Sequence, residues 1–372
     1  MNSEIKNKVY LTNSASVSAA GLNNDELFNN ITQSITGIEQ KTNYFQDTSP
    51  AIGLIKSVNT FYENLYIQIE EILAKSNLDN FSNTILIIGS SVGGMNSTEN
   101  TLIKTNDYSK IQPHLHNING ISFLIEERFT FKDSISFSTA CTSSGNAIGY
   151  AHELLSKGIY ENALVIGIDQ ISQTTVGGFL SLGVLSSNPC KPFDTNRDGM
   201  NVAEGIACLL LQSTANKECV EICSVGYSSD AYHMTHPQPD GLGAQKSMSN
   251  ALENACLLPK DIRYINAHGT GTQANDEAEA NAIASIFGKD VYVSSTKSIT
   301  GHTLGAASAL EVVICSLVLA KQMIPTSTAL DKQENLDITI TKENISTNIQ
   351  YVMSNSFAFG GNNCSIVLGF VQ

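Results

Sequence analysis

Residues 134–147 read SISFSTACTSSGNA, and this stretch decides the fold prediction. The alternation in residues 134–137 predicts a β-strand, and the apolar spacing of residues 147–157 before Gly158 predicts a helix. Cys141 is therefore expected at a strand-to-helix turn, among small residues that let other groups approach its sulfur. The N–H groups of a helix N-terminus would favour the thiolate and lower the pKa of the cysteine. Cys141 is a candidate nucleophile, and a small thiol that only packs against the helix is the alternative.

The expected strands alternate with helices, which indicates an α/β protein with a largely parallel central sheet. The expected strands are residues 8–11, 84–89, 134–137, 163–167, 207–211, 218–227, 262–266, 291–295 and 365–368. The expected helices are residues 25–35, 60–75, 147–157, 243–255, 274–287 and 306–320. Residues 96–119 are polar and are expected to form a loop with at most one helix. A strand followed by a reactive residue occurs twice, at Cys141 and at His268, which suggests a repeated pattern.

The composition limits the possible partners. The 372 residues, of which 42% are hydrophobic and 15% charged, are enough for one large core or two fused halves. A formal net charge of −14 argues against binding to nucleic acid and to anionic membranes. No apolar run is expected to span a bilayer, and residues 1–8 lack the apolar core of a signal peptide. We therefore expect a cytoplasmic protein without a membrane partner.

Neither a metal site nor a disulfide framework is expected. The eight cysteines contain no CxxC pair and no regular spacing. His114 and His116 are close enough in sequence to bind a metal together, but no cysteine or carboxylate nearby completes a ligand set. A solvated loop is the favoured interpretation of this histidine pair.

Three later stretches change the interpretation of Cys141. They are residues 266–272 (NAHGTGT), 295–302 (STKSITGH) and 355–363 (NSFAFGGNN). Together with residues 138–147, and in this order, they resemble the β-ketoacyl-[acyl-carrier-protein] synthases, the elongating condensing enzymes of fatty acid and polyketide synthesis. Further similarity lies in residues 192–194, 197–199 and 228–235, and it is weakest before residue 85 and between residues 95 and 130.

The resemblance implies a thiolase-like fold, in which two similar halves are stacked as α-β-α-β-α layers. The join would fall near residue 213. Residues 1–212 would form the half that carries the nucleophilic cysteine, and residues 213–372 the half that carries two histidines and a gating loop. Because no linker rich in Pro, Gly and Ser marks the join, the halves are expected to share one core.

The resemblance also implies roles for the reactive side chains. Cys141 would hold an acyl group as a thioester. His268 and His302 would act as neutral imidazoles that donate Nε2–H to the thioester oxygen of a malonyl unit. Lys297 would be a charge partner in the site without forming a Schiff base, and the backbone N–H groups of Cys141 and Phe359 would form the oxyanion hole. A single histidine could be structural, but two in Gly-flanked turns favour a site.

Three acids are expected to support the site. Glu311 stands at the position that the family uses for a buried acid, so the resemblance implies a contact with Lys297. A buried lysine without an acid would have a strongly lowered pKa, which favours such a pair. The alternative is an ion pair on a helix surface, which stabilises little. Asp276 and Glu279 resemble acids that order the loop of His268, although the solvated first turn of a helix is an equal alternative.

Two further groups bind or admit the substrate in the family. Thr270 and Thr272 resemble the pair that holds the phosphopantetheine arm, and hydrogen bonding within a turn is the alternative. Phe359 resembles a gate to the acyl pocket, with Gly360 and Gly361 as its hinge. A Gly-rich turn before the last strand is the alternative interpretation of this loop.

The sequence departs from the family pattern in three places. Ala358 stands where a glycine is usual, which would cost about 1 kcal/mol if the position needed a positive φ. Gly271 stands where many members have serine, and this should loosen the loop. Residues 61–71 lack the basic cluster that usually binds an acidic carrier protein. Docking would then use other residues, such as Lys191 and Arg197, or a partner subunit.

These observations predict a decarboxylative Claisen condensation between a Cys141-bound acyl group and malonyl-acyl-carrier protein. No cofactor is expected beyond the phosphopantetheine of the carrier protein, and the assembly should be a homodimer or a heterodimer with a related ketosynthase. The short divergent regions suggest specialised polyketide or polyene synthesis. The alternative is a chain-length-factor-type partner subunit. A thiolase is disfavoured, because Cys364 opens the closing strand and is better interpreted as packing.

Overall fold

The computed structural model describes residues 7–215, 219–328, 330, 332 and 336–371. Residues 1–6 of the polar N-terminus and Glu218, at the start of an expected strand, lie outside the described residues. The strands are β1 (Tyr10–Ser18), β2 (Ile38–Gln40), β3 (Ala51–Gly53), β4 (Thr84–Gly89), β5 (Asp133–Phe137), β6 (Asn162–Asp169), β7 (Gly205–Gln212), β8 (Cys219–Ser229), β9 (Ile262–Asn266), β10 (Tyr292–Ser294), β11 (Met323–Ile324), β12 (Thr339–Ile340), β13 (Ile345–Ser346), β14 (Tyr351–Phe357) and β15 (Asn362–Val371).

The helices include short 3-10 turns, labelled η. They are α1 (Asn24–Thr32), α2 (Phe61–Lys75), α3 (Met95–Thr105), η1 (Tyr108–Lys110), α4 (Pro113–His116), α5 (Asn119–Glu126), α6 (Ser143–Ser156), α7 (Gln173–Ser181), α8 (Leu242–Ala255), η2 (Pro259–Asp261), α9 (Gln273–Phe287), α10 (Lys297–Thr300), η3 (Leu304–Ala306) and α11 (Ala307–Lys321).

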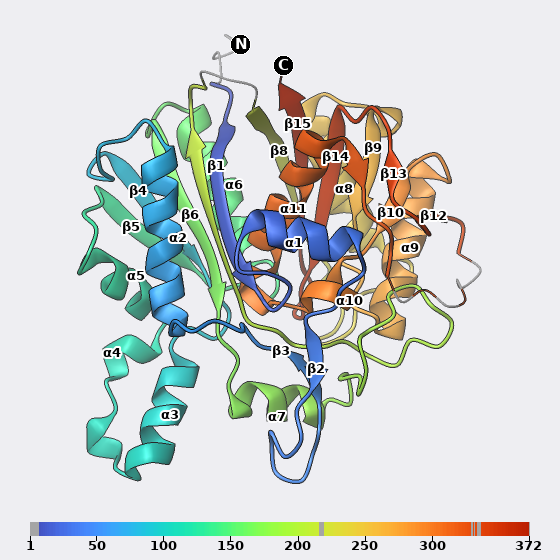
Figure 1. Cartoon of the computed structure of the whole chain (residues 1–372). Coiled ribbons are helices and arrows are strands. Elements are labelled where there is room, and N and C mark those ends of the chain that lie inside the picture. The colour runs from blue at the N-terminus through green and yellow to red at the C-terminus, as the bar shows by residue number, and fades with distance from the viewer. Residues whose placement is uncertain (1–6, 216–218, 329, 331, 333–335, 372) are drawn as a thin grey trace.

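A single sheet of 11 strands runs through the described part of the molecule, in the order β12-β10-β9-β14-β15-β8-β1-β7-β6-β4-β5 (Figure 1). Its two halves meet where β1 pairs with β8 over two residue pairs, Tyr10 with Glu221 and Leu11 with Val220. The same strand order recurs in both halves: β5-β4-β6-β7-β1 in the first matches β10-β9-β14-β15-β8 in the second, which has the short strand β12 as an addition at its outer edge. Two similar halves are thus visible in the structure, and the boundary at residue 213 stays a prediction.

The expectation of a largely parallel sheet is wrong at the centre. The outer strands β5, β4 and β6 on one side, and β12, β10, β9 and β14 on the other, pair in parallel. The central strands β7, β1, β8 and β15 pair antiparallel with their neighbours. Each half therefore combines parallel crossovers with one reversed strand, β7 or β15, which lies between the first strand of that half and the others and is antiparallel to both neighbours.

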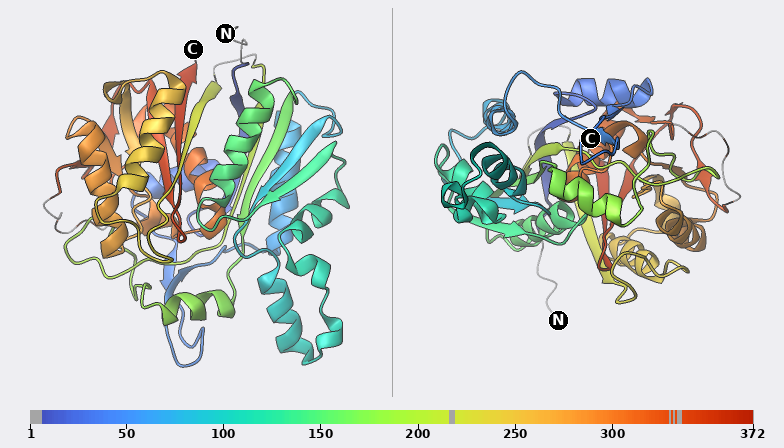
Figure 2. Two further views of the ribbon diagram at one scale, coloured as in Figure 1. Left: turned by 180° about the vertical axis from the view of Figure 1, so that it is seen from behind. Right: turned by 90° about the horizontal axis from the view of Figure 1, so that it is seen from below.

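Helices α6 and α11 form a buried layer between the two halves of the sheet (Figures 1 and 2). α11 packs against β6 and β7 of one half and against β14 and β15 of the other, and α6 contacts β4 and β8. Helix α2 covers the outside of the first half, and α8 and α9 cover the outside of the second (Figure 2). The predicted α-β-α-β-α arrangement is confirmed.

The structure shows that Cys141 and His268 do not occupy equivalent positions in the two halves, contrary to the repeat that the sequence suggested. β5 and β10 are the third strands of their halves, and each leads into a central helix, α6 or α11. Cys141, between β5 and α6, therefore corresponds to the segment from Lys297 to His302. His268 follows β9, which corresponds to β4. The pairing of Cys141 with His268 was wrong because the sequence alone does not show the strand order.

The segment Leu304–Lys321, which contains α11, is long and apolar enough to cross a membrane by length and composition, contrary to the sequence-based expectation. Of its 18 residues, 78% are buried inside the molecule. A helix in a central layer packs on all sides, so it is apolar on all sides. We interpret this segment as the core helix of the fold.

The main local difference from the prediction lies in residues 96–119, which form α3, η1 and α4 and project from the body (Figure 1). None of the residues of α3 or α4 is buried. The polar composition of this segment, which suits helices that bury none of their residues, explains why the sequence indicated mostly loop. β1 is also longer than predicted and extends to Ser18, because half-buried polar residues interrupt its apolar pattern.

Gly89 brings the end of β4 against the first turn of α6. A Cβ atom at this position would lie 2.4 Å from the Cα and 2.5 Å from the backbone N of Ser144. We expect Gly89→Ala to lower the free energy of unfolding by about 1–3 kcal/mol, because backbone atoms must shift. Gly178→Ala in α7 is the matched control, since no atom lies within 4 Å of its Cβ position. Equal urea midpoints for both variants would contradict this close approach.

Candidate active site

Cys141 lies between the end of β5 and the start of α6 and is 9% exposed. Thr142 is the N-cap residue of α6. Ala140 has a φ of +54°, a left-handed conformation that is uncommon outside glycine. The predicted strand-to-helix turn is confirmed, and its backbone is strained next to the sulfur.

The expected lowering of the Cys141 pKa is not what the structure shows. Burial raises the pKa of Cys141 to about 11, and this outweighs the opposing effect of the Lys297 charge. The backbone N–H groups of Phe359 and Cys141 also donate to the sulfur and oppose the increase. The helix N-terminus therefore does not by itself create a thiolate, because the effect of burial on the pKa is larger.

His302 contacts the sulfur directly. Its Nε2 lies 3.0 Å from Cys141 Sγ. The backbone N–H of Leu304 donates to His302 Nδ1 over 3.2 Å, so the ring proton of the neutral imidazole is on Nε2. Burial, followed by the charge of Lys297, holds the pKa of His302 well below its usual range. His302 is thus a neutral donor aimed at the sulfur.

His268 lies beside His302, with 5.2 Å between the ring centroids and an angle of 87° between the ring planes. Burial, the charge of Lys297 and the neighbouring His302 hold the pKa of His268 well below its usual range. One sulfur atom and two imidazole nitrogens, from Cys141, His268 and His302, all lie within 4.8 Å of one another. The structure brings together the three reactive side chains that the sequence identified.

Lys297 forms an ion pair with Glu311, and both side chains are buried. Ser356 Oγ lies 3.5 Å from the carboxylate of Glu311. Ser308 Oγ lies 2.8 Å from Ser356 Oγ and 3.3 Å from the carbonyl oxygen of Cys141, so its one hydrogen can be donated to either. The predicted contact is confirmed, and the alternative of a surface pair is wrong.

Glu279 and Asp276 order the loop of His268 by accepting hydrogen bonds from backbone N–H groups. Glu279 accepts hydrogen bonds from the backbone N–H groups of His268 and Gly269, both at 2.8 Å. Asp276 accepts from the N–H of Phe193, also at 2.8 Å. Burial raises the pKa of Glu279 to about 7 and that of Asp276 to about 6. Both acids are fully buried, so the alternative of a solvated helix turn is wrong.

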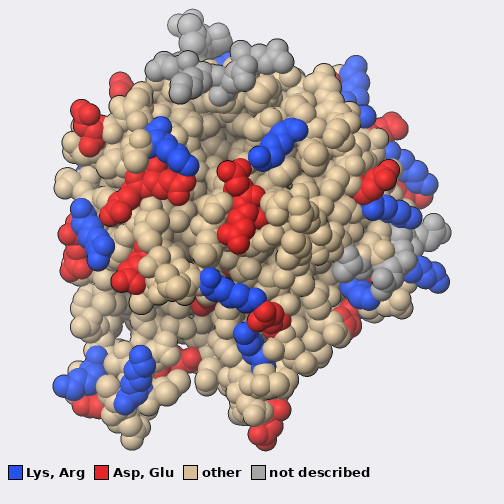
Figure 3. All heavy atoms as spheres, viewed as in Figure 1, with Lys and Arg blue, Asp and Glu red and all other residues tan. Residues whose placement is uncertain are grey.

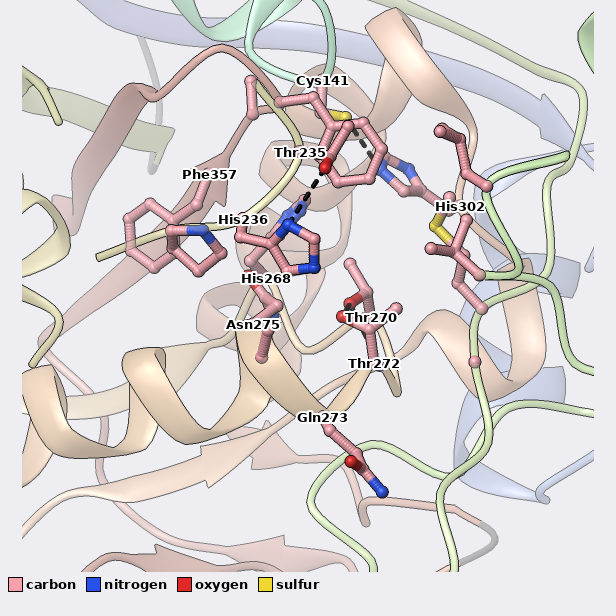
Figure 4. A pocket seen from close by; sticks show the side chains of 18 of the residues that line it. Cys141, Thr235, His236, His268, Thr270, Thr272, Gln273, Asn275, His302 and Phe357 are labelled. Carbon is pink, nitrogen blue, oxygen red and sulfur yellow. Dashed lines mark hydrogen bonds between the residues drawn. The ribbon is translucent and has the colours of Figure 1, made fainter. Parts of the chain in front are cut away.

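The reactive side chains open into one cavity of about 400 Å³ (Figure 4). Thr270 and Thr272 line it, with 2.9 Å between their Oγ1 atoms. The sequence-based expectation placed both hydroxyls along a substrate arm, and this position in the cavity suits that use. Apolar lining comes from Phe179, Leu182, Val184, Met200, Phe357 and Phe359.

Phe359 also lines the cavity, 6.2 Å from the ring of Phe179. The two glycines that follow it have positive φ, +85° at Gly360 and +78° at Gly361. No atom lies within 4 Å of the Cβ position of Gly360, so the loop has free space there. These features are what a movable loop requires.

Two family models match the chain. The one described as "Beta-ketoacyl synthase, N-terminal domain" matches residues 11–217, and "Beta-ketoacyl synthase, C-terminal domain" matches residues 219–331. The chain belongs to the β-ketoacyl synthase family. As a β-ketoacyl-[acyl-carrier-protein] synthase it is an acyltransferase.

Curated relatives of this ketosynthase are named 3-oxoacyl-[acyl-carrier-protein] synthase 2. The protein from Coxiella burnetii is 37% identical over 310 residues, which cover 76% of this chain and 74% of the relative. The protein from Staphylococcus aureus is 30% identical over 97% of both chains.

Solved structures show the same fold. A chain of the ketosynthase in complex with its chain length factor from Xenorhabdus doucetiae superimposes with a TM-score of 0.90, at 29% identity over 98% of both chains. A β-ketoacyl synthase from Burkholderia phymatum gives a TM-score of 0.88 at 26% identity, over 98% of this chain and 100% of that one. The thiolase-like fold of the ketosynthase is confirmed.

Two of the departures from the family pattern, Ala358 and Gly271, fit the local backbone of this ketosynthase. Ala358 is not among the described residues with positive φ, so it carries none of the expected strain. Gly271 has a φ of +81°, and a Cβ there would lie 2.7 Å from the carbonyl oxygen of Gly199. This glycine fits a constrained turn, and the expectation that it loosens the loop is wrong.

Arg197 does not contribute to a docking surface, contrary to the expectation. It is 5% exposed, and its Nη1 donates to the carbonyl oxygen of Asp194 at 2.9 Å. Its Nε lies 3.7 Å from the buried carboxylate of Asp276. The guanidinium therefore holds the loop of Asp276 in the interior of the ketosynthase.

Sequence reasoning missed several polar residues of the site. Asp230, His233 and His236 line the cavity, and the Nδ1 atoms of the two histidines are 3.2 Å apart. Asp230 accepts a hydrogen bond from Asn363 Nδ2, which joins this segment to the last strand. The similarity of residues 228–235 to the family was the available signal, but it carried no role. Asp169, buried behind the site, had no sequence signal.

The sulfur and the two imidazole nitrogens of this ketosynthase are close enough to share a metal ion. A metal ligand must offer a lone pair, but the N–H of Leu304 already occupies the lone pair on Nδ1 of His302. The Nε2–H that remains is a donor. The geometry suits hydrogen bonding to a substrate oxygen better than metal binding.

The raised pKa gives a prediction for the reactivity of Cys141. We expect its alkylation by iodoacetamide to accelerate about tenfold for each pH unit between about pH 7 and pH 10, since only the thiolate reacts. The acid form dominates below the raised pKa of about 11, so the reactive fraction keeps rising with pH. Mass spectrometry of the Cys141 peptide measures the rate, with Cys141→Ser as the control. A plateau below about pH 8 would contradict the prediction.

Proposed function

We propose that this chain condenses an acyl group on Cys141 with malonyl-acyl-carrier protein, releasing CO2 and a β-ketoacyl product. The observation that carries the proposal is the cluster of Cys141 Sγ with the nitrogens of His268 and His302, all within 4.8 Å, on the wall of one cavity. A nucleophile and two neutral hydrogen-bond donors are what this reaction needs.

In the first step, the sulfur of Cys141 attacks the thioester carbonyl of an acyl chain on its carrier. Because the thiol is protonated at neutral pH, its proton must leave and reach the departing pantetheine thiolate. The N–H groups of Cys141 and Phe359 already donate to the sulfur, so we propose that they bind the oxyanion of the tetrahedral intermediate. The acyl group ends as a thioester on Cys141.

In the second step, the malonyl carboxylate leaves as CO2, and its bonding electrons form an enolate at the thioester. His268 and His302 donate to the enolate oxygen. Burial, followed by the positive charge of Lys297, lowers the pKa of both imidazoles and keeps them neutral. The enolate carbon attacks the acyl carbonyl, and the bond to Cys141 breaks. The released thiolate takes up one proton, which balances the reaction.

We propose that Thr270 and Thr272 bind the pantetheine arm and that the loop of Phe359 to Gly361 gates the acyl pocket. Their positions in the cavity support both roles. Acyl carrier protein would be the partner that delivers substrate, in the cytoplasm, with no cofactor beyond its phosphopantetheine. The likeness to a ketosynthase that is in complex with its chain length factor supports specialised polyketide or polyene synthesis.

The assembly we propose is a dimer, either of two copies or with a related ketosynthase. β5 lies at the edge of the large sheet, and residues 133–135 of this strand are exposed. An uncovered edge strand is a ready site for pairing with another chain. The likeness to the Xenorhabdus doucetiae complex supports a two-chain assembly.

The alternative function is a chain-length-factor-type subunit that shapes the pocket of a catalytic partner. It is favoured by the surface charge, since the described residues on the face of Figure 3 show acids among the bases and no continuous basic patch. Several of the surface lysines pair with acids, as Lys56 does with Glu39. The intact cluster of Cys141, His268 and His302 favours the catalytic function.

Intact-protein mass spectrometry distinguishes the two functions. The chain is incubated with acyl-carrier protein and malonyl-carrier protein, and Cys141→Ala serves as the control. We expect wild type to gain one acyl mass and to release a β-ketoacyl carrier product, whereas Cys141→Ala does neither. If the isolated chain shows neither change, and activity appears only when a second ketosynthase is added, the partner-subunit function is correct.

A further inference from the structure

Asp169, at the end of β6, is a buried carboxylate with an unusual number of donors. It is 1% exposed. Oδ1 accepts from Ser90 Oγ at 2.6 Å and from the N–H of Val92 at 3.0 Å. Oδ2 accepts from the N–H of Ser91 at 2.9 Å and from the N–H of Gly305 at 2.6 Å. These donors belong to two loops that are far apart in the sequence, and both reach the reactive side chains.

One of these loops carries His302. Gly305 directly follows Leu304, which has a φ of +52° and donates its N–H to Nδ1 of His302. A Cβ at Gly305 would lie 2.7 Å from Oδ2 of Asp169, so this approach requires glycine. The carboxylate of Asp169 accepts the N–H of Gly305 and so fixes the strained turn at Leu304. The N–H of Leu304 in turn sets the tautomer of His302.

The other loop reaches Cys141. Ser91 donates its N–H to Asp169 and its Oγ to the carbonyl oxygen of Ala140, at 2.8 Å. Ala140 has a φ of +54° and directly precedes Cys141. Ser143 Oγ also donates to this carbonyl, at 2.6 Å. The carbonyl group of Ala140 is therefore held by two hydroxyl groups, those of Ser91 and Ser143. Ser91 is itself bound to Asp169 through its backbone N–H.

We propose that Asp169 is a positioning residue that holds both strained turns of the site, fixing the Nε2–H tautomer of His302 through Gly305 and the orientation of Cys141 through Ser91. It touches no substrate and acts through its neighbours. Non-glycine residues persist in left-handed conformations where the surrounding structure fixes them. One carboxylate, with hydrogen bonds to both loops, supplies that constraint here. The kinetic part of the inference rests on the proposed function.

Asparagine at this position separates the two connections. Its one oxygen can still accept from Ser90 and Val92, and from the N–H of Ser91, which lies 3.1 Å from Oδ1 as well as 2.9 Å from Oδ2. Its NH2 group then faces the N–H of Gly305, which has no other oxygen of this side chain to bind, and two donors cannot bond. Asp169→Asn should therefore release the His302 turn. Ser91→Ala removes the hydroxyl that reaches Ala140 and keeps the backbone N–H on Asp169, so it should weaken the Cys141 turn alone.

The first test is NMR of protein labelled with 15N-histidine, in which the ring nitrogens report the tautomer. The chain has seven histidines, and His302→Gln identifies the signal of His302. We expect the pure Nε2–H tautomer in wild type and in Ser91→Ala, and a mixture with the Nδ1–H tautomer in Asp169→Asn. An Nδ1–H tautomer in wild type, or an unchanged signal in Asp169→Asn, would overturn the inference. This readout does not depend on activity.

The second test separates the two partial reactions. We expect Asp169→Asn to lower the rate of condensation about 10- to 100-fold, the loss seen when a group that orients a metal-bound histidine is removed. Ser91→Ala should lower the acylation rate of Cys141 about 2- to 10-fold, as expected for one hydrogen bond, with condensation of the preformed acyl enzyme unchanged. Equal losses in both steps for both variants would show a merely structural role.

The outcomes are distinguishable from those of the proposed function. If wild type never acylates Cys141, the proposed function fails, and the histidine tautomers still decide the role of Asp169. If Asp169→Asn does not fold, Ser91→Ala decides alone. Slower acylation with an unchanged His302 signal would then support the inference, and unchanged acylation would overturn it.

Discussion

Replacing Lys297 with methionine is expected to lower the free energy of unfolding by about 3–5 kcal/mol near neutral pH, because it leaves a buried charge without a partner. Lys297 is 1% exposed and Glu311 is 3% exposed, so water cannot replace the lost ammonium. The double variant Lys297→Met/Glu311→Leu should recover most of this loss, since both charges are then absent. Urea denaturation of the two single variants and the double variant measures the coupling.

The same variant should show a characteristic pH dependence. Burial already raises the pKa of Glu311 above its ordinary value of 4.5, and Lys297 opposes that increase. Without Lys297, Glu311 has a higher pKa in the folded state than in the unfolded state. Above pH 4.5 the folded state therefore binds more protons than the unfolded state, and the free energy of unfolding falls as the pH rises. The loss in Lys297→Met should therefore be smallest below that pH and grow toward neutrality.

A surface pair provides the control. Lys75 pairs with Glu71 on α2, and its side chain is 62% exposed. We expect Lys75→Met to change the free energy of unfolding by no more than about 0.5 kcal/mol, because water replaces the partner. If Lys297→Met proves as mild as this control, the two buried charges do not depend on each other.

The largest loss of activity is expected from the two histidines, and they should differ in which step they affect. His268→Ala should lower the rate of condensation about 10²- to 10³-fold, the cost of removing one donor to a developing negative charge. Acylation of Cys141 should change little, because no hydrogen bond joins His268 to the sulfur among the described residues. His302→Ala should slow both steps, since its Nε2 lies 3.0 Å from the sulfur.

Rapid-quench mass spectrometry measures both steps, with acyl-carrier protein alone for acylation and with malonyl-carrier protein added for condensation. His116→Ala is the control, because His116 lies on α4 and bonds to Thr98 outside the cavity. Equal loss of acylation in His268→Ala and His302→Ala would contradict separate roles for the two rings.

The reactive residues were predictable because each lies next to an element with a strong pattern. Cys141 follows an alternating strand, and Lys297 and His302 lie between a strand and an apolar helix. The ion pair of Lys297 with Glu311 was also predictable, because an isolated buried charge is too costly. These inferences combined the local pattern with the resemblance to the family, because the stretch around Cys141 alone left an inert, packed thiol as an alternative.

Other features depend on three-dimensional context. The pKa of Cys141 was expected to fall, but burial is set by groups from both halves of the chain and raises it. Asp169 was missed because its donors, Ser90 to Val92 and Gly305, are distant in sequence and mostly backbone groups. The projecting helices α3 and α4 bury none of their residues, and their polar composition indicated a loop.

The site is assembled across the two halves of the sheet, and this affects the chain during its synthesis. The ribosome produces Cys141 161 residues before its partner His302. The last strand, β15, then closes the sheet between β14 and β8. A chain that ends before His302 thus carries the thiol of Cys141 without the imidazole that contacts it. The complete site can therefore form only after both halves have been synthesised and folded together.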